Sequence, residues 1–199
     1  MLASISPLGE RARGNRWSRT VAWYFAGSIA GGTLLGAVCG ALGVLLREIS
    51  TPASGARAGL VVAAAGVALV MELHLFGARI PTIRRQVDEN WLARYRPWVY
   101  AGGFGFQLGL GVVTIVTTAT VYLVVVLAVL SGSPGFALLI GATFGLARAL
   151  PILVVRDASD PGALRQVLRR VQSWAMLARR AALGTVVGLA VVALATAAV

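Results

Sequence analysis

The chain has 199 residues, of which 58% are hydrophobic and 13% charged, and its formal net charge is +11. Soluble domains carry about 25% charged residues, so this composition excludes an ordinary soluble fold and favours membrane spans. The positive charge does not indicate nucleic-acid binding. The basic residues, all arginine, lie in short segments beside apolar runs, where they suit the anionic headgroups of a lipid bilayer on its cytoplasmic side.

Five apolar runs predict an all-α, polytopic transmembrane helical bundle, with spans at about residues 20–46, 58–78, 98–130, 136–155 and 181–199. Four arginines precede the first run, five separate the second from the third, and six separate the fourth from the fifth. The alternate segments hold only Arg47 and Arg57. Since cytoplasmic loops are rich in basic residues, we expect the N-terminus inside and the C-terminus outside, in a multi-pass protein of a bacterial cell membrane.

The chain is expected to divide into a basic, poorly ordered cytoplasmic N-terminal segment, residues 1–19, and a single transmembrane domain, residues 20–199. Basic cytoplasmic loops are expected at 79–97 and 156–180. Each loop has apolar residues at helical spacing, which predicts a short helix lying in the membrane interface or against other protein. These residues are Ile83, Val87, Trp91 and Tyr95 in the first loop and Leu164, Val167, Leu168, Val171 and Ala175 in the second.

The third run, residues 98–130, is too long for one straight span. At about 1.5 Å per residue a single helix would extend roughly 50 Å, against a hydrocarbon core of about 30 Å. The run must therefore tilt, kink or break, and the glycines crowded into its first half favour a break or a bend there.

Three ionisable residues lie inside the predicted spans: Glu72, His74 and Arg148. Such residues are costly in a bilayer and mark functional sites. Glu72 and Arg148 each lie about two helical turns before the inner end of a span, so they are expected at similar depth. We predict an ion pair between them, either as a clamp of the bundle or as part of a substrate site. His74 is two residues from Glu72 and so lies on another helix face. A proton relay through His74 is the less favoured hypothesis.

The third span also carries several polar side chains. Threonines in membrane helices often bond to carbonyls of their own helix, and a polar groove for a ligand is the alternative. The candidate substrate-binding residues are Gln107, Thr114, Thr117, Glu72 and Arg148. The sequence has no recognisable catalytic, cofactor-binding or metal-ligating cluster, so we expect no enzymatic activity, no cofactor and no metal.

Glycines at four-residue spacing predict close helix packing. They form a ridge in the first span (Gly32, Gly36, Gly40) and pairs elsewhere (Gly27/Gly31, Gly105/Gly109, Gly141/Gly145, Gly184/Gly188). The pattern leaves open whether they pack within one chain, in a homo-oligomer or against a membrane protein partner. A faint echo at an offset of 75, in which Trp23 matches Trp98 and Gly27 matches Gly102, is either a repeat of two spans or a chance match between apolar sequences.

Two stretches carry a family resemblance: GFQLGLG at residues 105–111, before a threonine-rich segment, and FGLARALP at residues 144–151. They resemble cytochrome c biogenesis membrane proteins of the CcdA/DsbD type, over roughly residues 98–199. The resemblance implies a related helical scaffold. That family has six spans and moves reducing equivalents outward through a pair of cysteines in them. In the family a Thr-Pro-Cys follows the Gly-Leu-Gly after one residue, whereas this chain has Val113, Thr114 and Ile115.

Thiol–disulfide chemistry is therefore not implied by the resemblance. The single cysteine, Cys39, lies in the first apolar run and cannot form a disulfide within the chain. The leading hypothesis is a small transporter-like membrane protein on a CcdA-like scaffold, without enzymatic activity. One alternative is a non-catalytic membrane subunit that packs a partner through its glycine ridges. Another is a redox relay in which Cys39 reacts with an external thiol.

Overall fold

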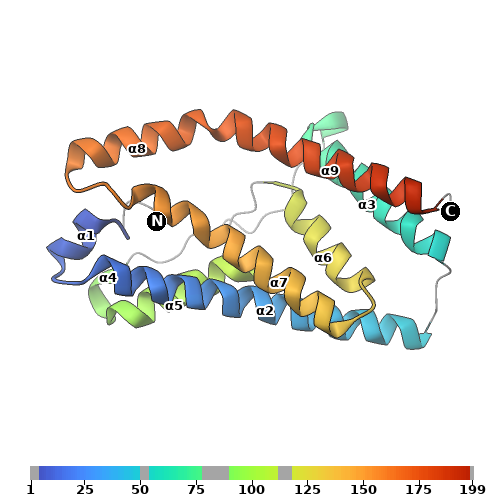
Figure 1. The fold of residues 1–199 in the computed structure, drawn as a ribbon, viewed down its shortest axis with the longest axis horizontal. Helices are drawn as coiled ribbons and strands as arrows, with labels where there is room; N and C mark the ends of the chain where they lie inside the picture. Colours follow the sequence, from blue (N-terminus) through green and yellow to red (C-terminus); the bar gives the residue numbers. More distant parts are fainter. Residues whose placement is uncertain (1–4, 50–53, 78–89, 112–117, 198–199) are drawn as a thin grey trace.

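The computed structural model describes residues 5–49, 54–77, 90–111 and 118–197, and every regular element in these ranges is helical (Figure 1). The all-α prediction is confirmed for this part of the chain. The elements are α1 (Pro7–Ala12), α2 (Trp17–Ile49), α3 (Ser54–Glu72), η1 (Leu75–Gly77), α4 (Trp91–Arg94), α5 (Pro97–Leu110), α6 (Thr120–Leu130), α7 (Pro134–Ala149), η2 (Leu150–Val155), α8 (Pro161–Ser173) and α9 (Ala175–Ala197).

Three helical stretches within the described ranges are long and apolar enough to cross a membrane: Trp17–Ile49, Pro134–Val155 and Pro161–Ala195. A fourth apolar helix, Thr120–Leu130, is shorter. The membrane prediction agrees with these helices, while the count of five spans and their orientation stay predictions. The last stretch is longer than the predicted final span, because α8 and α9 follow one another with only Trp174 between them.

The centre of the molecule is a seam of glycines along α2, which packs against α5 on one side and α7 on the other. A Cβ added to Gly27 would lie 2.1 Å from the Gly102 carbonyl oxygen, and one added to Gly32 would lie 2.1 Å from the Gly141 oxygen. No side chain fits at such distances, so the backbones touch directly, as helices do where lipid supplies no hydrophobic force between them. These glycine ridges therefore pack within the chain. We call this contact of α2, α5 and α7 the glycine seam.

The glycine seam brings together positions that match at the offset of 75. The rings of Trp23 and Trp98 lie 6.3 Å apart between centroids, and Gly27 faces Gly102. Helices α2 and α5 are parallel, because positions later in one lie opposite positions later in the other (Figure 1). The sequence echo thus corresponds to helices that face each other in register.

The N-terminal segment is folded from residue 5, so the expectation of poor order is wrong for residues 5–19. Ser6 caps α1 through a 3.1 Å hydrogen bond from the Gly9 amide, and Ile5 is fully buried in the core beside α2 and α5. The indole of Trp17 donates to the Ile5 carbonyl at 3.2 Å. The segment therefore packs against the first turns of α2 and α5.

The third apolar run is broken, which confirms that it cannot be one straight helix. Helix α5 ends at Leu110, and its cap Gly111 has a φ of 72°, a left-handed conformation that glycine adopts without strain. Helix α6 begins at Thr120 after the cap residue Ala119. The break follows the glycine-rich stretch rather than dividing it.

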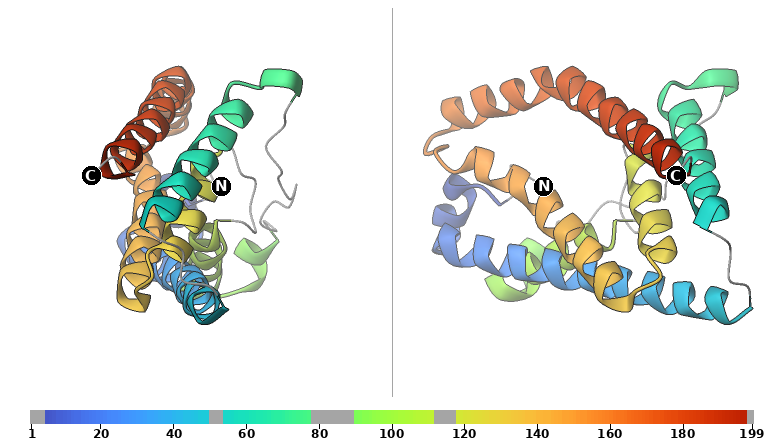
Figure 2. Two further views of the ribbon diagram at one scale, coloured as in Figure 1. Left: turned by 90° about the vertical axis from the view of Figure 1, so that its right-hand side faces the viewer. Right: turned by 45° about the vertical axis from the view of Figure 1, so that its right-hand side comes forward.

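Helices α3 and α9 pack on each other to one side of the glycine seam, and α6 lies between (Figure 2). Helix α8 confirms the predicted helix in the loop 156–180, since Leu164 and Val167 pack on the core while Arg165 and Arg169 are exposed. Of the helix predicted in the first loop, Trp91 lies in α4 and Tyr95 just after it, whereas Ile83 and Val87 lie outside the described residues.

Candidate functional site at the break between α5 and α6

The break between α5 and α6 creates two helix ends inside one apolar run. A helix end leaves backbone carbonyls or amides without partners, and its dipole favours a cation at the C-terminal end and an anion at the N-terminal end. In hydrocarbon these groups must be satisfied by protein. The structure places one predicted site residue at each end.

Arg148, from α7, lies at the C-terminal end of α5. Its Nη1 donates to the Gly111 carbonyl oxygen at a long 3.5 Å, and its guanidinium carbon lies 5.4 Å from the centre of the Phe144 ring. The side chain is half-buried. A cation here matches the negative end of the α5 dipole.

Glu72, the last residue of α3, lies at the N-terminal end of α6. It is only 4% exposed, and its Oε2 accepts a 2.9 Å hydrogen bond from the amide of Ala119. A buried carboxylate here matches the positive end of the α6 dipole. The backbone oxygen of Glu72 accepts a 2.8 Å hydrogen bond from Nη2 of Arg179, which ties the end of α3 to α9.

The structure does not join Glu72 to Arg148. The predicted ion pair is not among the contacts of the described residues, and each charge instead bonds to the backbone at its own side of the same break. His74 does not lie on a helix face within a span: it follows α3 in an exposed turn, with a φ of 56° and Nδ1 at 3.2 Å from the Glu72 carbonyl oxygen.

Of the remaining candidates, the structure describes Gln107. Gln107 is half-buried on α5, one turn before Gly111. Thr114 and Thr117 lie outside the described residues. Thr118 follows, and its hydroxyl lies 2.8 Å from that of Thr120 at the start of α6.

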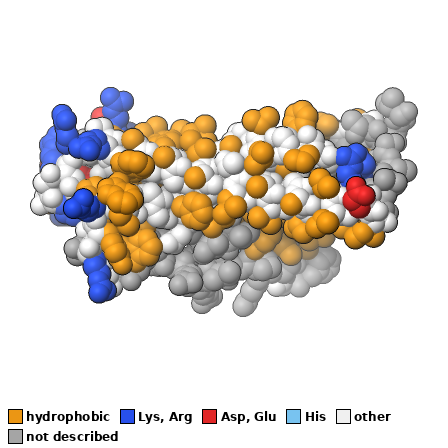
Figure 3. Space-filling model, turned by 90° about the horizontal axis from the view of Figure 1, so that it is seen from below, with side chains coloured by type: hydrophobic (Ala, Val, Ile, Leu, Met, Phe, Trp, Pro, Cys, Tyr) orange, Lys and Arg blue, Asp and Glu red, His pale blue; other side chains and the backbone are white. Residues whose placement is uncertain are grey.

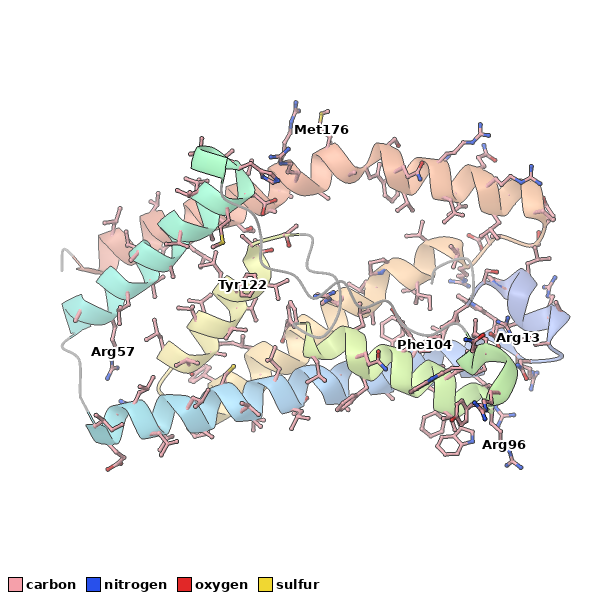
Figure 4. The ribbon with its side chains drawn as sticks, turned by 180° about the vertical axis from the view of Figure 1, so that it is seen from behind. Arg13, Arg57, Arg96, Phe104, Tyr122 and Met176 are labelled. Carbon is pink, nitrogen blue, oxygen red and sulfur yellow. The ribbon has the colours of Figure 1, made fainter. Side chains whose placement is uncertain are left out.

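A cavity of about 310 Å³ lies beside the N-terminal half of α6. It is almost wholly apolar, and α3 lines one wall and α6 the other. The lining includes Met71, next to Glu72, together with Ala119 and Tyr122, which is labelled in Figure 4. An apolar, partly open cavity therefore adjoins the helix end that Glu72 binds.

Sequence reasoning missed a second buried carboxylate, that of Glu10 in α1, which is 0% exposed. The Tyr100 hydroxyl lies 2.8 Å from both carboxylate oxygens, Thr20 donates to Oε2 at 2.8 Å, and Arg13 donates to Oε1 at 2.6 Å. We call these four residues the Glu10 network. The one available signal was that Glu10 is the only acidic residue among the four arginines of residues 1–19.

The Glu10 network also affects the charge on Arg13. Burial opposes that charge, but the hydrogen bond and the field of the Glu10 carboxylate outweigh it, so the pKa of Arg13 lies above its ordinary value. Figure 4 shows Arg13 beside the start of α5, at the end of the molecule that also carries Arg96, whereas Arg57 lies at the opposite end.

Comparison with known families agrees with this architecture. The model of the cytochrome c biogenesis protein transmembrane region matches residues 2–191. The chain belongs to this family. The resemblance is therefore confirmed, but limiting it to residues 98–199 was wrong, because the match also covers the first half.

Curated relatives are named methylamine utilization protein MauF. The chain is 33% identical to the protein of Paracoccus denitrificans over 177 residues, which cover 86% of this chain and 60% of the relative. It is 35% identical to that of Paracoccus versutus over 157 residues, or 76% and 57% of the two chains. For Methylorubrum extorquens the identity is 32% over 179 residues, or 89% and 61%. The chain thus spans about 60% of the length of these relatives. No solved structure matches.

Cys39 is a free thiol, 2% exposed, and packs with Ala128 and Ala137 between α2, α6 and α7. The sequence contains no second cysteine. The family scaffold is therefore present here with a single, enclosed thiol.

Proposed function

We propose that this chain is a non-enzymatic, transporter-like protein of the cell membrane that moves a small polar solute past the break between α5 and α6. We further propose that it serves methylamine utilization, the process in the name of its relatives. Its polar site would comprise Glu72, Arg148 and Gln107, completed by Thr114 and Thr117.

The observation that carries this proposal is that a buried carboxylate, Glu72, and a half-buried guanidinium, Arg148, bond to the two ends of one broken helix. Discontinuous spans place helix ends and free backbone groups at the depth where transporters bind polar substrates. A purely structural span would not need a break, whose backbone groups are costly in lipid unless protein or water satisfies them. The apolar cavity next to Glu72 leaves open space beside this site, into which α3 and α6 could move when a solute passes.

Deletion of the gene in its native host tests the proposal. Growth with methylamine as the nitrogen source should slow or stop, while growth on ammonium should continue. The wild-type gene should restore growth on methylamine, and Glu72→Gln or Arg148→Gln should not, although both variants reach the membrane at wild-type levels.

Two exposed charges far from the break serve as matched controls. Glu48→Gln and Arg165→Gln remove the same charges from the surface of α2 and α8, and should restore growth fully. Undiminished growth of the deletion strain on methylamine would refute the role in that process. Full rescue by both Glu72→Gln and Arg148→Gln would refute the site.

The proposed orientation has five spans with the N-terminus inside. The distribution of arginines supports it, and in Figure 3 most basic side chains on the face shown lie at one end of the molecule. A cysteine placed at Ser133, between α6 and α7, should react with an impermeant thiol reagent added to intact cells. One placed at Ser159, between η2 and α8, should react only after lysis; its labelling in intact cells would reverse the orientation.

One observation favours the alternative of a membrane subunit that binds a partner. Unlike the glycines of the glycine seam, Gly59 and Gly66 on α3 and Gly184 and Gly188 on α9 have no described atom within 4 Å of an added Cβ. Replacing both Gly184 and Gly188 by leucine should abolish copurification of a partner, or self-association, if α9 is the docking face. Unchanged association would eliminate this face.

The redox relay through Cys39 receives the least support. A thiol that is 2% exposed and packed between helices is not accessible to an external thiol partner.

A further inference from the structure

A second cavity, of about 360 Å³, lies at the arginine-rich end of the molecule, between the starts of α2 and α5. Its walls combine basic, amide and aromatic side chains from the two helices and from the turn before α2. The residues that matter are Asn15, Arg16, Arg19, Thr20, Trp23 and Trp98. None of the lining residues is acidic.

The positive charge of this cavity has no counterion within the described part of the chain. Arg16 and Arg19 are exposed, and neither guanidinium has a hydrogen bond or ion pair there. The nearest described carboxylate in the sequence, Glu10, is fully buried and already accepts from Arg13, Thr20 and Tyr100. The cavity is therefore complementary to an anion.

The other half of the cavity is aromatic and faces outward. Trp23 is 49% exposed and Trp98 is 53% exposed, although their rings are only 6.3 Å apart. Tryptophan concentrates at the level of lipid headgroups, where its ring contacts acyl chains and its N–H contacts water. A ligand that meets both the arginines and this pair must carry an anionic head on an apolar body.

The N-terminal ends of the two parallel helices, α2 and α5, also favour an anion in this cavity. Helix α2 begins at Trp17 and α5 at Pro97, so both N-terminal dipole ends point toward the same cavity. They supplement the charge of the arginines, although the assignment does not depend on them.

We propose that this cavity binds one molecule of an anionic phospholipid, with its phosphate between Arg16 and Arg19 and the start of an acyl chain against Trp23 and Trp98. A lipid headgroup and free phosphate would both present a phosphate anion to the two arginines. The tryptophan pair selects the lipid, because only the lipid has an acyl chain. The site is separate from the break between α5 and α6 and does not depend on the transport proposal.

Native mass spectrometry of the purified chain in detergent tests the site. Titration with phosphatidylglycerol should show one bound lipid at concentrations where phosphatidylcholine, without net charge, gives none. Arg16→Gln/Arg19→Gln should weaken this binding about ten- to thirtyfold, at about 1 kcal/mol for each arginine. The matched control is Arg165→Gln/Arg169→Gln on α8, which removes the same charge and should change the binding less than twofold.

A second experiment distinguishes a bound phospholipid from bound inorganic phosphate. Trp98→Ala should weaken phosphatidylglycerol binding severalfold, while inorganic phosphate should not displace the lipid from the wild-type chain at equal concentration. Displacement by phosphate, or an unchanged lipid affinity in Trp98→Ala, would overturn the lipid assignment. Equal losses in Arg16→Gln/Arg19→Gln and Arg165→Gln/Arg169→Gln would overturn the site itself, because binding would then depend on net charge alone.

Discussion

The glycine seam and the pair of helices α3 and α9 are built on similar sequence patterns but pack in different ways. In the seam, Gly32 and Gly141 leave no room for a single carbon atom. On the other pair, Gly66 and Gly184 have no described atom within 4 Å of an added Cβ. The spacing of small residues thus predicts a helix face without bulky side chains. It does not predict whether another helix of the chain packs on that face.

A buried carboxylate lies beside each region, Glu10 in α1 next to the glycine seam and Glu72 at the end of α3, and the two differ in how many groups hold them. Glu10 accepts from three side chains that join α1, α2 and α5 into one unit. Glu72 accepts from one backbone amide at the start of α6. We therefore expect Glu10 to hold a fixed structure, while Glu72 holds an end of the break that function can use.

The sharpest test of this comparison uses the same substitution in both regions. Gly32→Ala should destabilise the chain by about 2–3 kcal/mol, because the new methyl group would push α2 and α7 apart. Gly184→Ala should leave it unchanged or stabilise it by up to about 1 kcal/mol, since alanine favours helix and meets nothing there. Thermal unfolding in detergent measures both, and equal losses would refute the distinction between a covered and an open face.

The Glu10 network should give the next largest effect. Tyr100→Phe removes the donor that reaches both carboxylate oxygens and should cost about 1.5–3 kcal/mol. It should also speed trypsin cleavage within residues 11–19, because Glu10 in α1 loses its hydrogen bonds to α5. In a Glu10→Gln background the same change should cost clearly less. Wild-type cleavage of Tyr100→Phe would show that the network does not hold α1 in place.

Glu72 and Arg148 should act independently on stability. Each satisfies a different helix end, so Glu72→Gln and Arg148→Gln should each cost about 0.5–2 kcal/mol, and the double variant should show the sum to within about 0.5 kcal/mol. Unfolding of the three variants in one detergent measures this. If the loss in the double variant differs from the sum of the single losses by more than about 1 kcal/mol, the two side chains interact, as the ion pair predicted from the sequence requires.

The smallest effect is expected at Cys39. Cys39→Ser buries a hydroxyl among Ala128 and Ala137 and should cost about 1 kcal/mol, while growth on methylamine is retained. Cys39→Ala provides the control without a hydroxyl. Loss of growth in both variants, with normal protein levels, would support the hypothesis of a redox relay through Cys39.

The sequence predicted the features that depend on pattern and length. The helical class, the break in residues 98–130 and the close packing of glycines all follow from how apolar runs fit a bilayer. The partners of Glu72 and Arg148 could not be predicted, because shared depth says nothing about which backbone groups a break leaves open. The burial of Glu10 could not be predicted, because it depends on Tyr100, which lies 90 residues away in the chain.

The break in the third apolar run has a consequence for how the protein is assembled. Helix α5 has 14 residues and α6 has 11, so at about 1.5 Å per residue neither half reaches across a core of about 30 Å. The carbonyl of Gly111 receives its partner from Arg148, which is synthesised 37 residues later. In the five-span arrangement that we propose, α5 and α6 would enter lipid stably only after α7 has been made. We therefore expect α5, α6 and α7 to enter the membrane together, as one unit of insertion.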